Sequence, residues 1–342
     1  MAVKVVQLFD SQDSTLPDYG DMIRQAGIDV EFVKANCFTE EQIVAGAADA
    51  DAVIGSATFQ PFSRNVIEKL ERCRFIMSLG IGFECLDVDA ATEHGVLAAN
   101  VPDYCLDEMS DHVMALLLAG TRKIAKLDRF VRSGGWRPER ASEIRNTIWP
   151  TMSRLRDQTL GIVGLGRIGR MLVPKAKGFG MHVVAYDPYV DAETMASVGV
   201  EKLELDDLLA RADAVSLHCA LTPETRHLLG REQLRKMKPS AYLVNTARGG
   251  LVDQSALCDA IAAGGIAGAA LDVVDPEPID SDDPLLGLDT VIVTPHSAHA
   301  SVPAFTTLGL RPGEEVIRVF SGQWPVGLIN HEAKDAYSRK WG

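Results

Sequence analysis

The chain has 342 residues, of which 46% are hydrophobic and 24% are charged, and its formal net charge is −13. These fractions are typical of a globular protein, and the length predicts two domains. The acidic balance and the lack of a dense basic run argue against binding to nucleic acid or to an anionic membrane surface. The longest apolar run, 113–119, is too short to cross a bilayer, and no signal-like segment precedes the first expected strand.

The six cysteines show no spacing typical of a metal site and lie in apolar surroundings: Cys37, Cys73, Cys85, Cys105, Cys219 and Cys258. Scattered thiols of this kind are typical of reduced side chains in a cytoplasmic protein. We therefore expect a cytoplasmic location and no metal ion.

The first 100 residues alternate short apolar runs with helical patterns. Strands are expected over 3–9, 29–33, 52–55 and 75–79, and helices over 16–26, 40–48 and 63–70. Strands separated by helices predict a parallel sheet with helices on both faces.

Two glycines follow the strand expected at 75–79, in the sequence Gly80-Ile81-Gly82. Ligands of open α/β sheets bind at the carboxyl ends of strands, and glycines there let backbone N–H groups approach a ligand closely. The three residues are therefore interpreted as a carboxylate-binding loop or as an ordinary turn.

A single long helix is expected from Leu106 to about Ser133, closed by Gly134-Gly135. Its length makes it a candidate spine or subunit interface. The stretch 136–156 shows little periodicity and is expected to be irregular. Within it, Trp149 is a candidate for surface packing, for a subunit contact or for a lid.

The segment 159–187, TLGIVGLGRIGRMLVPKAKGFGMHVVAYD, predicts a strand over 160–163, a glycine turn, a helix, a second strand over 182–186 and then an acid. Gly164 permits the tight turn, Gly166 lets the backbone approach a pyrophosphate, and Gly169 lets the helix pack close to the sheet. The helix N-terminus presents free N–H groups to the phosphates. Asp187 is placed to accept hydrogen bonds from both hydroxyls of the adenosine ribose, which favours NAD over its 2′-phosphorylated form.

The same alternation continues after Asp187, and three successive strand ends deliver ionisable side chains. Arg248 follows the strand expected at 241–245, Asp272 and Glu277 follow the next, and His296 follows the strand at 291–294. Because these ends share one edge of a parallel sheet, we expect the side chains to meet beside the cofactor. Towards the C-terminus, a helix is expected over 313–320.

Four motifs, LGIVGLGRIGR, VNTARGGLVD, LDVVDPEP and VTPH, occur in the order and spacing of one family. With them the whole chain resembles the D-isomer-specific 2-hydroxyacid dehydrogenases. The stretch 103–118 resembles the bacterial relatives of the C-terminal-binding protein corepressors. The resemblance implies NAD as cofactor and a reaction between a 2-keto acid and its D-2-hydroxy acid.

The resemblance also implies roles for individual residues. Arg248 would bind the substrate carboxylate, His296 would donate and accept the proton, and Glu277 would orient and charge the imidazole. Other residues would hold the cofactor or the substrate. Arg167 and Ile168 would lie under the pyrophosphate, Ala220, Thr246 and Ala247 would line the cofactor site, Asp272 would face the nicotinamide, and Gly80, Ile81 and Gly82 would bind the substrate carboxylate.

Two further positions leave alternatives open. His299 stands where the corepressors carry a tryptophan, and it is either a substrate contact or a partly exposed histidine at a domain junction. Trp149 falls where some glyoxylate and hydroxypyruvate reductases place a tryptophan that reaches the partner subunit, which suggests a homodimer.

The expected fold is α/β, with two doubly wound parallel sheets. A Rossmann NAD-binding domain, 102–296, is inserted in a discontinuous flavodoxin-like substrate domain, 1–101 and 297–342. The expected function is that of an NAD-dependent oxidoreductase for a small 2-keto acid of the glyoxylate, hydroxypyruvate or pyruvate kind. The alternative is an NAD(H)-sensing, corepressor-like interaction protein with little turnover.

Overall fold

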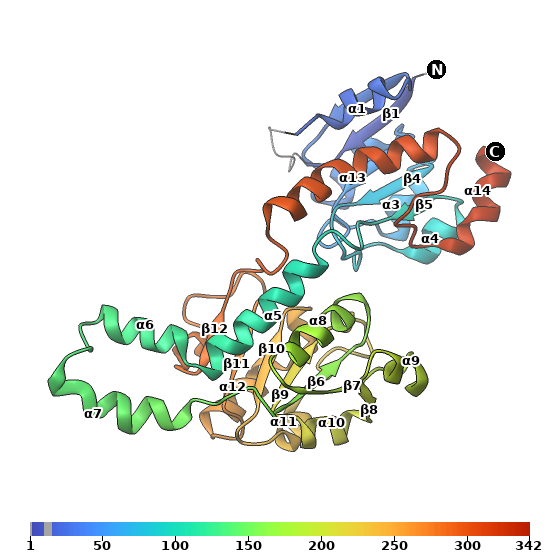
Figure 1. The fold of residues 1–342 in the computed structure, drawn as a ribbon. Coiled ribbons are helices and arrows are strands. Elements are labelled where there is room, and N and C mark those ends of the chain that lie inside the picture. Colours follow the sequence, from blue (N-terminus) through green and yellow to red (C-terminus); the bar gives the residue numbers. More distant parts are fainter. Residues whose placement is uncertain (1, 10–15) are drawn as a thin grey trace. The chain divides into compact units, whose positions relative to one another are not determined.

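The computed structural model describes residues 2–9 and 16–342, and it divides the chain into two compact units (Figure 1). The terminal unit comprises Met1–Tyr104 and Ser301–Gly342, and the central unit comprises Cys105–Ala300. The boundaries lie within a few residues of the crossings expected near 102 and 297. Each unit is built on one parallel sheet, so the predicted fold class is confirmed.

The terminal unit holds a five-stranded sheet in the order β2-β1-β3-β4-β5. All neighbouring strands are parallel, and this order is that of flavodoxin-like sheets. The strands are β1 (Val3–Gln7), β2 (Val30–Lys34), β3 (Ala52–Gly55), β4 (Phe75–Ser78) and β5 (Leu97–Ala99).

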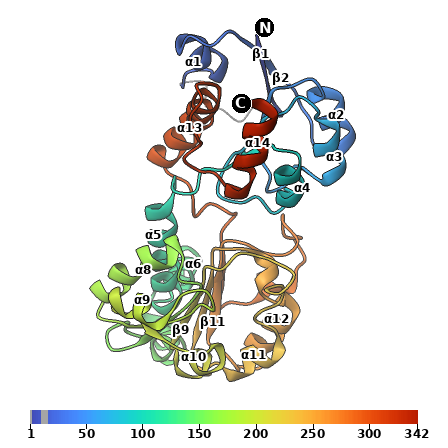
Figure 2. The same cartoon turned by 90° about the vertical axis from the view of Figure 1, so that its right-hand side faces the viewer.

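Helices cover both faces of this sheet, as the two hydrophobic clusters of the unit show (Figure 2). One face is covered by α1 (Tyr19–Gln25) and α13 (Val302–Phe320). The other is covered by α2 (Glu40–Ala47), α3 (Arg64–Lys69) and α4 (Val88–Glu93). The last helix, α14 (Lys334–Trp341), is tied to the unit by a hydrogen bond from Trp341 Nε1 to the Gly95 carbonyl.

The helix expected over 313–320 is present, but it begins earlier than predicted. Helix α13 begins at Val302, after the N-cap Ser301, and contains Pro312 in its interior. A proline inside a helix removes one backbone hydrogen bond. Burial of Ala304, Val316 and Val319 against the sheet compensates for that loss, and packing of this kind is invisible to local propensity.

The central unit holds a seven-stranded parallel sheet in the order β12-β11-β10-β9-β6-β7-β8. Counted from β6, this is the dinucleotide-binding order 3-2-1-4-5-6 with one further strand. The strands are β6 (Thr159–Val163), β7 (His182–Tyr186), β8 (Glu201–Lys202), β9 (Ala214–Leu217), β10 (Tyr242–Asn245), β11 (Gly268–Leu271) and β12 (Val291–Val293).

Helices again lie on two sides. Those of one side pack in a cluster with Leu160 and Ile162, and they are α5 (Leu106–Thr121), α8 (Arg167–Gly178) and α9 (Ala192–Ser197). Those of the other side pack with Val215 and Leu217, and they are α10 (Leu205–Arg211), α11 (Arg231–Lys236) and α12 (Gln254–Ala262).

The prediction of a single long helix from Leu106 to about Ser133 is wrong. Helix α5 ends at Thr121, and α6 (Ile124–Arg132) starts after Lys123, whose φ of 54° is left-handed. Lys123 is buried with its amine 5.6 Å from the centre of the Tyr242 ring, and this tertiary contact accompanies the break.

Residues 122–152 form an arm, which Figure 1 shows projecting from the central unit with α6 and α7 (Ala141–Glu143). Its remaining helical turns span Pro138–Arg140, Ile144–Ile148 and Trp149–Thr151, where irregular chain was expected. A hydrogen bond from Ser153 N to Thr121 O closes its base. Large apolar side chains are exposed along it.

No helix in residues 2–9 and 16–342 is long and apolar enough to span a membrane. All six cysteines lie in this described part of the chain and are free thiols.

Candidate active site

The glycine turn after β6 has the shape that a dinucleotide requires. Gly164 has a φ of +94°, and a Cβ there would lie 2.7 Å from the Cys219 nitrogen. A Cβ at Gly169 would lie 2.5 Å from the Gly164 carbonyl oxygen. At Gly166, the N-cap of α8, nothing lies within 4 Å of the added atom. The turn is therefore closed on its protein side and open in front of the helix N-terminus that begins with Arg167 and Ile168, where a pyrophosphate is bound in such folds.

Asp187 follows β7 and lies beside this turn. Its carboxylate accepts hydrogen bonds from the Leu165 and Tyr189 N–H groups, both at 2.9 Å. The bond to Leu165 ties the acid to the glycine turn, on the edge where the predicted ribose contact would be made.

Thr246 supplies a further observation that fits a ligand at this edge. Its side chain is 2% exposed, and its hydroxyl oxygen has no hydrogen-bond partner among the described residues. Buried polar groups are normally satisfied, so this unpaired hydroxyl after β10 is available for a hydrogen bond with a ligand group. Ala247 follows Thr246, and Ala220 lies after the neighbouring strand β9.

His296 and Glu277 form an ion pair at the carboxyl edge of the same sheet. The His296 Nδ1 atom lies 2.8 Å from Glu277 Oε2, and Glu277 Oε1 accepts from the Val274 N–H at 3.1 Å. His296 has a φ of 50°, an uncommon conformation for a side chain other than glycine. Glu277 lies in the segment after β11, and His296 lies in the segment after β12. These two strands are adjacent in the sheet.

The ion pair shifts the pKa values of both His296 and Glu277. The hydrogen bond that His296 Nδ1 donates to Glu277 raises the pKa of His296 above 6.5, although burial opposes the shift. Burial raises the pKa of Glu277, but the hydrogen bond and charge of His296 outweigh it and leave that pKa lowered. The arrangement favours an imidazolium held by a carboxylate, with Nε2 left as the group that can donate a proton.

Asp272 organises the loop that bears His296. Its carboxylate is 2% exposed and accepts hydrogen bonds from Thr294 Oγ1 at 2.5 Å, Ser297 N at 2.9 Å and Ala298 N at 2.8 Å. Its backbone carbonyl accepts from the His296 N–H at 2.8 Å. A contact with the nicotinamide end would therefore be made by a carboxylate that already holds the 294–298 loop.

Sequence reasoning missed His112 of α5, which joins this network. Its Nε2 atom lies 3.2 Å from Thr294 Oγ1 and 3.6 Å from an Asp272 oxygen. Only the fold brings the helix beside the loop, and no local signal in the sequence marks the residue.

Arg248 lies on the loop after β10, beside the Glu277 loop. Its Nη1 atom donates to the Ala247 carbonyl at 2.7 Å, and its charge acts on the pKa values of both Glu277 and His296. Gly249, which the sequence did not single out, lets the two loops meet, because a Cβ there would lie 1.9 Å from the Val274 carbonyl oxygen.

His299 follows three residues after His296, with its ring centre 6.1 Å away at an edge-on angle of 82°. Burial, and then the charge of His296, lower the pKa of His299, which favours its neutral ring.

In the terminal unit, the loop Gly80-Ile81-Gly82 turns its carbonyls into the protein. The three oxygens accept from Val101 N, Asn100 Nδ2 and Ser78 Oγ, at 2.9, 2.7 and 3.1 Å. Within the described residues the three N–H groups donate to no protein acceptor. With Gly80 at a φ of +97°, the loop presents donors that suit a carboxylate.

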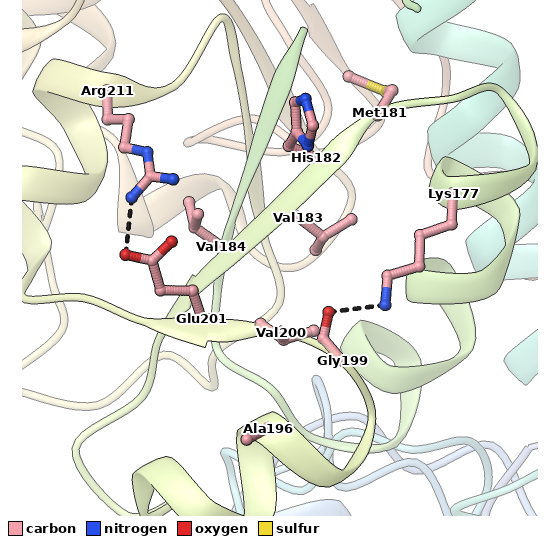
Figure 3. Close-up of a pocket in the computed structure, with 10 residues that line it drawn as sticks. All are labelled: Lys177, Met181, His182, Val183, Val184, Ala196, Gly199, Val200, Glu201 and Arg211. Carbon is pink, nitrogen blue, oxygen red and sulfur yellow. Dashed lines mark hydrogen bonds and ion pairs between the residues drawn. The ribbon is translucent and has the colours of Figure 1, made fainter. Parts of the chain in front are cut away.

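The pocket in Figure 3 lies elsewhere. It is lined by residues at the start of β7, among them His182 and Val183, and so lies at the amino end of the strand. Its cations are engaged, since Lys177 binds the Gly199 carbonyl at 2.6 Å and Arg211 binds Glu201 at 2.7 Å. None of the predicted site residues lines it.

Among the residues that the structure describes, no group of three or more histidine, cysteine or acidic side chains is arranged to hold a metal ion.

Comparison with known proteins places the chain. Residues 114–298 match the family model described as D-isomer specific 2-hydroxyacid dehydrogenase, NAD binding domain. The chain is 40% identical over 298 residues to a D-3-phosphoglycerate dehydrogenase of Methanocaldococcus jannaschii, covering 86% of this chain and 55% of that protein. It is 39% identical over 298 residues to a glyoxylate reductase of Korarchaeum cryptofilum, covering 86% of this chain and 87% of that protein.

The structure also resembles the holo form of D-mandelate dehydrogenase from Rhodotorula graminis. The TM-score is 0.85 at 28% identity, covering 96% of this chain and 97% of that one. The chain spans only about half the length of the phosphoglycerate dehydrogenase but most of the length of the other two. The resemblance noted in the sequence is confirmed, and so is NAD as the cofactor of the central unit. The chain belongs to the D-isomer specific 2-hydroxyacid dehydrogenase family, whose members are NAD-dependent oxidoreductases.

Proposed function

We propose that the chain interconverts a 2-keto acid and its D-2-hydroxy acid with NAD as the hydride carrier. The observation that supports this most strongly is the 2.8 Å pair of His296 and Glu277 at the strand edge that also bears the dinucleotide turn. An imidazolium fixed by a carboxylate is suited to protonating a carbonyl oxygen as hydride arrives at the carbon.

The chain's own residues then have distinct tasks. NADH, when bound, supplies the hydride to C2 of the keto acid. Arg248 binds the substrate carboxylate through its planar guanidinium and polarises the carbonyl. His296 Nε2 gives its proton to the developing alkoxide, and Glu277 keeps the ring oriented and charged. In oxidation the neutral ring takes the proton back.

The remaining predicted residues would bind the two ligands. The N–H groups of Gly80, Ile81 and Gly82 would hold the substrate carboxylate, with His299 as a further substrate contact. Gly164, Gly166, Arg167, Ile168 and Gly169 would cradle the pyrophosphate, Asp187 would bind the ribose, and Ala220, Thr246, Ala247 and Asp272 would line the rest of the cofactor site. Support comes from the open space at Gly166 and from the unpaired Thr246 hydroxyl.

We further propose that the protein is a cytoplasmic homodimer joined through the arm. Six free thiols support the compartment. On the arm, Ile124, Val131, Trp136 and Trp149 expose 47 to 78% of their surface. A run of half-exposed aliphatic and indole side chains is typical of an interface.

The experiment that tests the function follows NADH oxidation with 2-keto acids alongside a fluorescence titration of NADH binding. We expect a kcat of roughly 1 to 1,000 per second on some keto acid. His296→Gln should lower kcat by about 100-fold or more and leave the Kd of NADH unchanged. Tight NADH binding without turnover on any keto acid would instead support the NAD(H)-sensing interpretation.

A further inference from the structure

We propose that Phe9, Phe38 and Phe59 form the surface that selects the substrate, and that the substrate is a 2-keto acid with a bulky apolar or aromatic group beyond C2. This inference rests on the proposed function and deepens it. It concerns the terminal unit alone.

The three phenylalanines form a cluster that is exposed on its outer side. The ring centres of Phe9 and Phe59 are 5.4 Å apart, those of Phe9 and Phe38 are 6.3 Å apart, and Phe38 and Phe59 stack at 6.4 Å and 21°. Phe38 is 51% exposed and Phe59 is 54% exposed. Single exposed apolar residues are common, but a contiguous aromatic group left half open is a binding surface for another apolar group.

The cluster lies where ligands of such sheets bind. Phe38, Phe9 and Phe59 follow β2, β1 and β3, which are adjacent in the sheet. The next strand in order is β4, which leads into Gly80-Ile81-Gly82. Three aromatic side chains and the carboxylate-binding loop therefore occupy consecutive positions along the carboxyl edge of the sheet.

Side-chain hydrogen bonds fix the cluster beside that loop. Thr58 Oγ1 donates to the Gly82 carbonyl at 3.3 Å, and the Cys85 thiol donates to the Thr58 carbonyl at 3.3 Å. Phe59 follows Thr58 directly, so these hydrogen bonds tie the segment that bears its ring to the loop Gly80-Ile81-Gly82.

A buried glutamine ties the other rings to the same place. Gln60, at 0% exposure, donates from Nε2 to the Cys37 carbonyl at 2.6 Å and accepts from Ser56 N at 2.6 Å. This bridge joins the loop after β3 to the loop after β2, and so holds Phe59 near Phe38. The aromatic surface is therefore preorganised.

Charge along this edge argues against a phosphorylated substrate. Within the described residues, the segments that follow the five strands contain no lysine or arginine (residues 8–9, 16–18, 35–39, 56–63, 79–87 and 100–104), and they contain the acids Asp18, Glu84, Asp87 and Asp103. Lys34, the last residue of β2, lies 3.2 Å from Asp18 and is paired with it. A phosphate group carries about −1.5 to −2 charges at neutral pH and would meet acids without a free cation in these loops.

The test compares kcat/KM for NADH-dependent reduction of four acids: glyoxylate, 4-methyl-2-oxopentanoate, phenylpyruvate and 3-phosphohydroxypyruvate. We expect phenylpyruvate or 4-methyl-2-oxopentanoate to exceed glyoxylate by about 10- to 100-fold, from apolar burial against the rings. The phosphorylated acid should be the poorest substrate.

Variants separate selection from folding. Phe59→Ala and Phe38→Ala should each lower kcat/KM for phenylpyruvate by about 10-fold, mainly through KM, and change glyoxylate by less than about twofold. Phe179→Ala is the matched control, because that phenylalanine is 46% exposed in the central unit, at the end of α8. It should change neither substrate.

The results that would overturn this inference differ from those that would overturn the proposed function. A preference for glyoxylate or for the phosphorylated acid would overturn the inference and leave the proposed function standing. An equal loss on every substrate in the Phe59 variant would show a structural role and also overturn it. No turnover of any 2-keto acid would instead overturn the proposed function, and this inference with it.

Discussion

At the scale of single residues, the activity depends on the state of His296. Reduction requires the protonated ring, and the hydrogen bond that the ring donates to Glu277 raises its pKa above 6.5. We therefore expect kcat/KM for keto acid reduction to be constant at low pH and to fall tenfold per pH unit above a midpoint higher than 6.5. Oxidation requires the neutral ring and should rise through the same midpoint.

Glu277→Gln tests the source of this shift. The variant removes the charge that raises the pKa of His296, so the midpoint of the reduction profile should move to lower pH. Glu232→Gln, an exposed acid on α11, is the control and should leave the midpoint in place. An unchanged midpoint in the Glu277 variant would contradict the assignment of the pair.

The ion pair of His296 and Glu277 also makes the stability of the fold depend on pH. The His296 contribution is complete below 6.5 and is lost as pH rises through its raised pKa. The Glu277 contribution is complete above 4.5 and is lost as pH falls through its lowered pKa. The pair therefore stabilises the fold most fully between these two values.

Asp187 should set the choice of cofactor. In Asp187→Asn the side-chain oxygen can still accept from Leu165 N, but the negative charge that opposes a 2′-phosphate is lost. The ratio of kcat/KM with NADH to that with NADPH should fall about 10-fold or more, from loss of repulsion at short range. Steady-state kinetics with both cofactors measures it, and an unchanged ratio would assign the discrimination to other residues.

At the scale of elements, the close approach of two loops positions the arginine. Gly249→Ala would place a methyl group 1.9 Å from the Val274 carbonyl oxygen, so the Arg248 loop must move. A shift of about 1 Å at a catalytic group lowers the rate by about 100-fold, which is the loss of kcat/KM expected here.

Gly178→Ala is the matched control for that substitution. Gly178 ends α8 and has nothing within 4 Å of the added atom. Alanine in this helical position should leave activity intact and raise stability by about 0.5 to 1 kcal/mol, as measured by denaturant unfolding. Equal losses of activity in both variants would mean that Gly249 has no special role.

The elements also show what the sequence could predict. The runs 160–163 and 182–186 are short, apolar and bounded by glycine or an acid, and they predict both strands to within one residue of the observed bounds. The break at Lys123 was not predictable, because it accompanies a contact with the Tyr242 ring from a distant strand. The early start of α13 depends likewise on burial against the sheet of the terminal unit.

In the candidate site, too, some residues could be predicted from the sequence and others could not. Arg248, Glu277 and His296 follow strands, so sequence order alone predicts that they share a sheet edge. The roles of Asp272 and His112 in holding the 294–298 loop depend on hydrogen bonds across the fold, over separations of 22 to 182 residues. Local patterns contain no information on such distances.

At the scale of the whole molecule, the arm should determine the oligomeric state. We expect the native protein to sediment at about twice the chain mass of 37.0 kDa, and Trp136→Ser with Trp149→Ser to sediment as a monomer. Tyr189→Ser is the control, because that side chain is 95% exposed but lies outside the arm. A native monomer in analytical ultracentrifugation would contradict the proposed interface.

The product of the reaction is its most direct evidence. The purified protein is incubated with NADH and the 2-keto acid that it consumes fastest among those whose hydroxy acid is chiral, which leaves out glyoxylate, and the hydroxy acid enantiomers are then resolved and quantified. We expect one D-2-hydroxy acid for each NADH consumed. Formation of the L-enantiomer, of a racemate, or loss of NADH without hydroxy acid would contradict it.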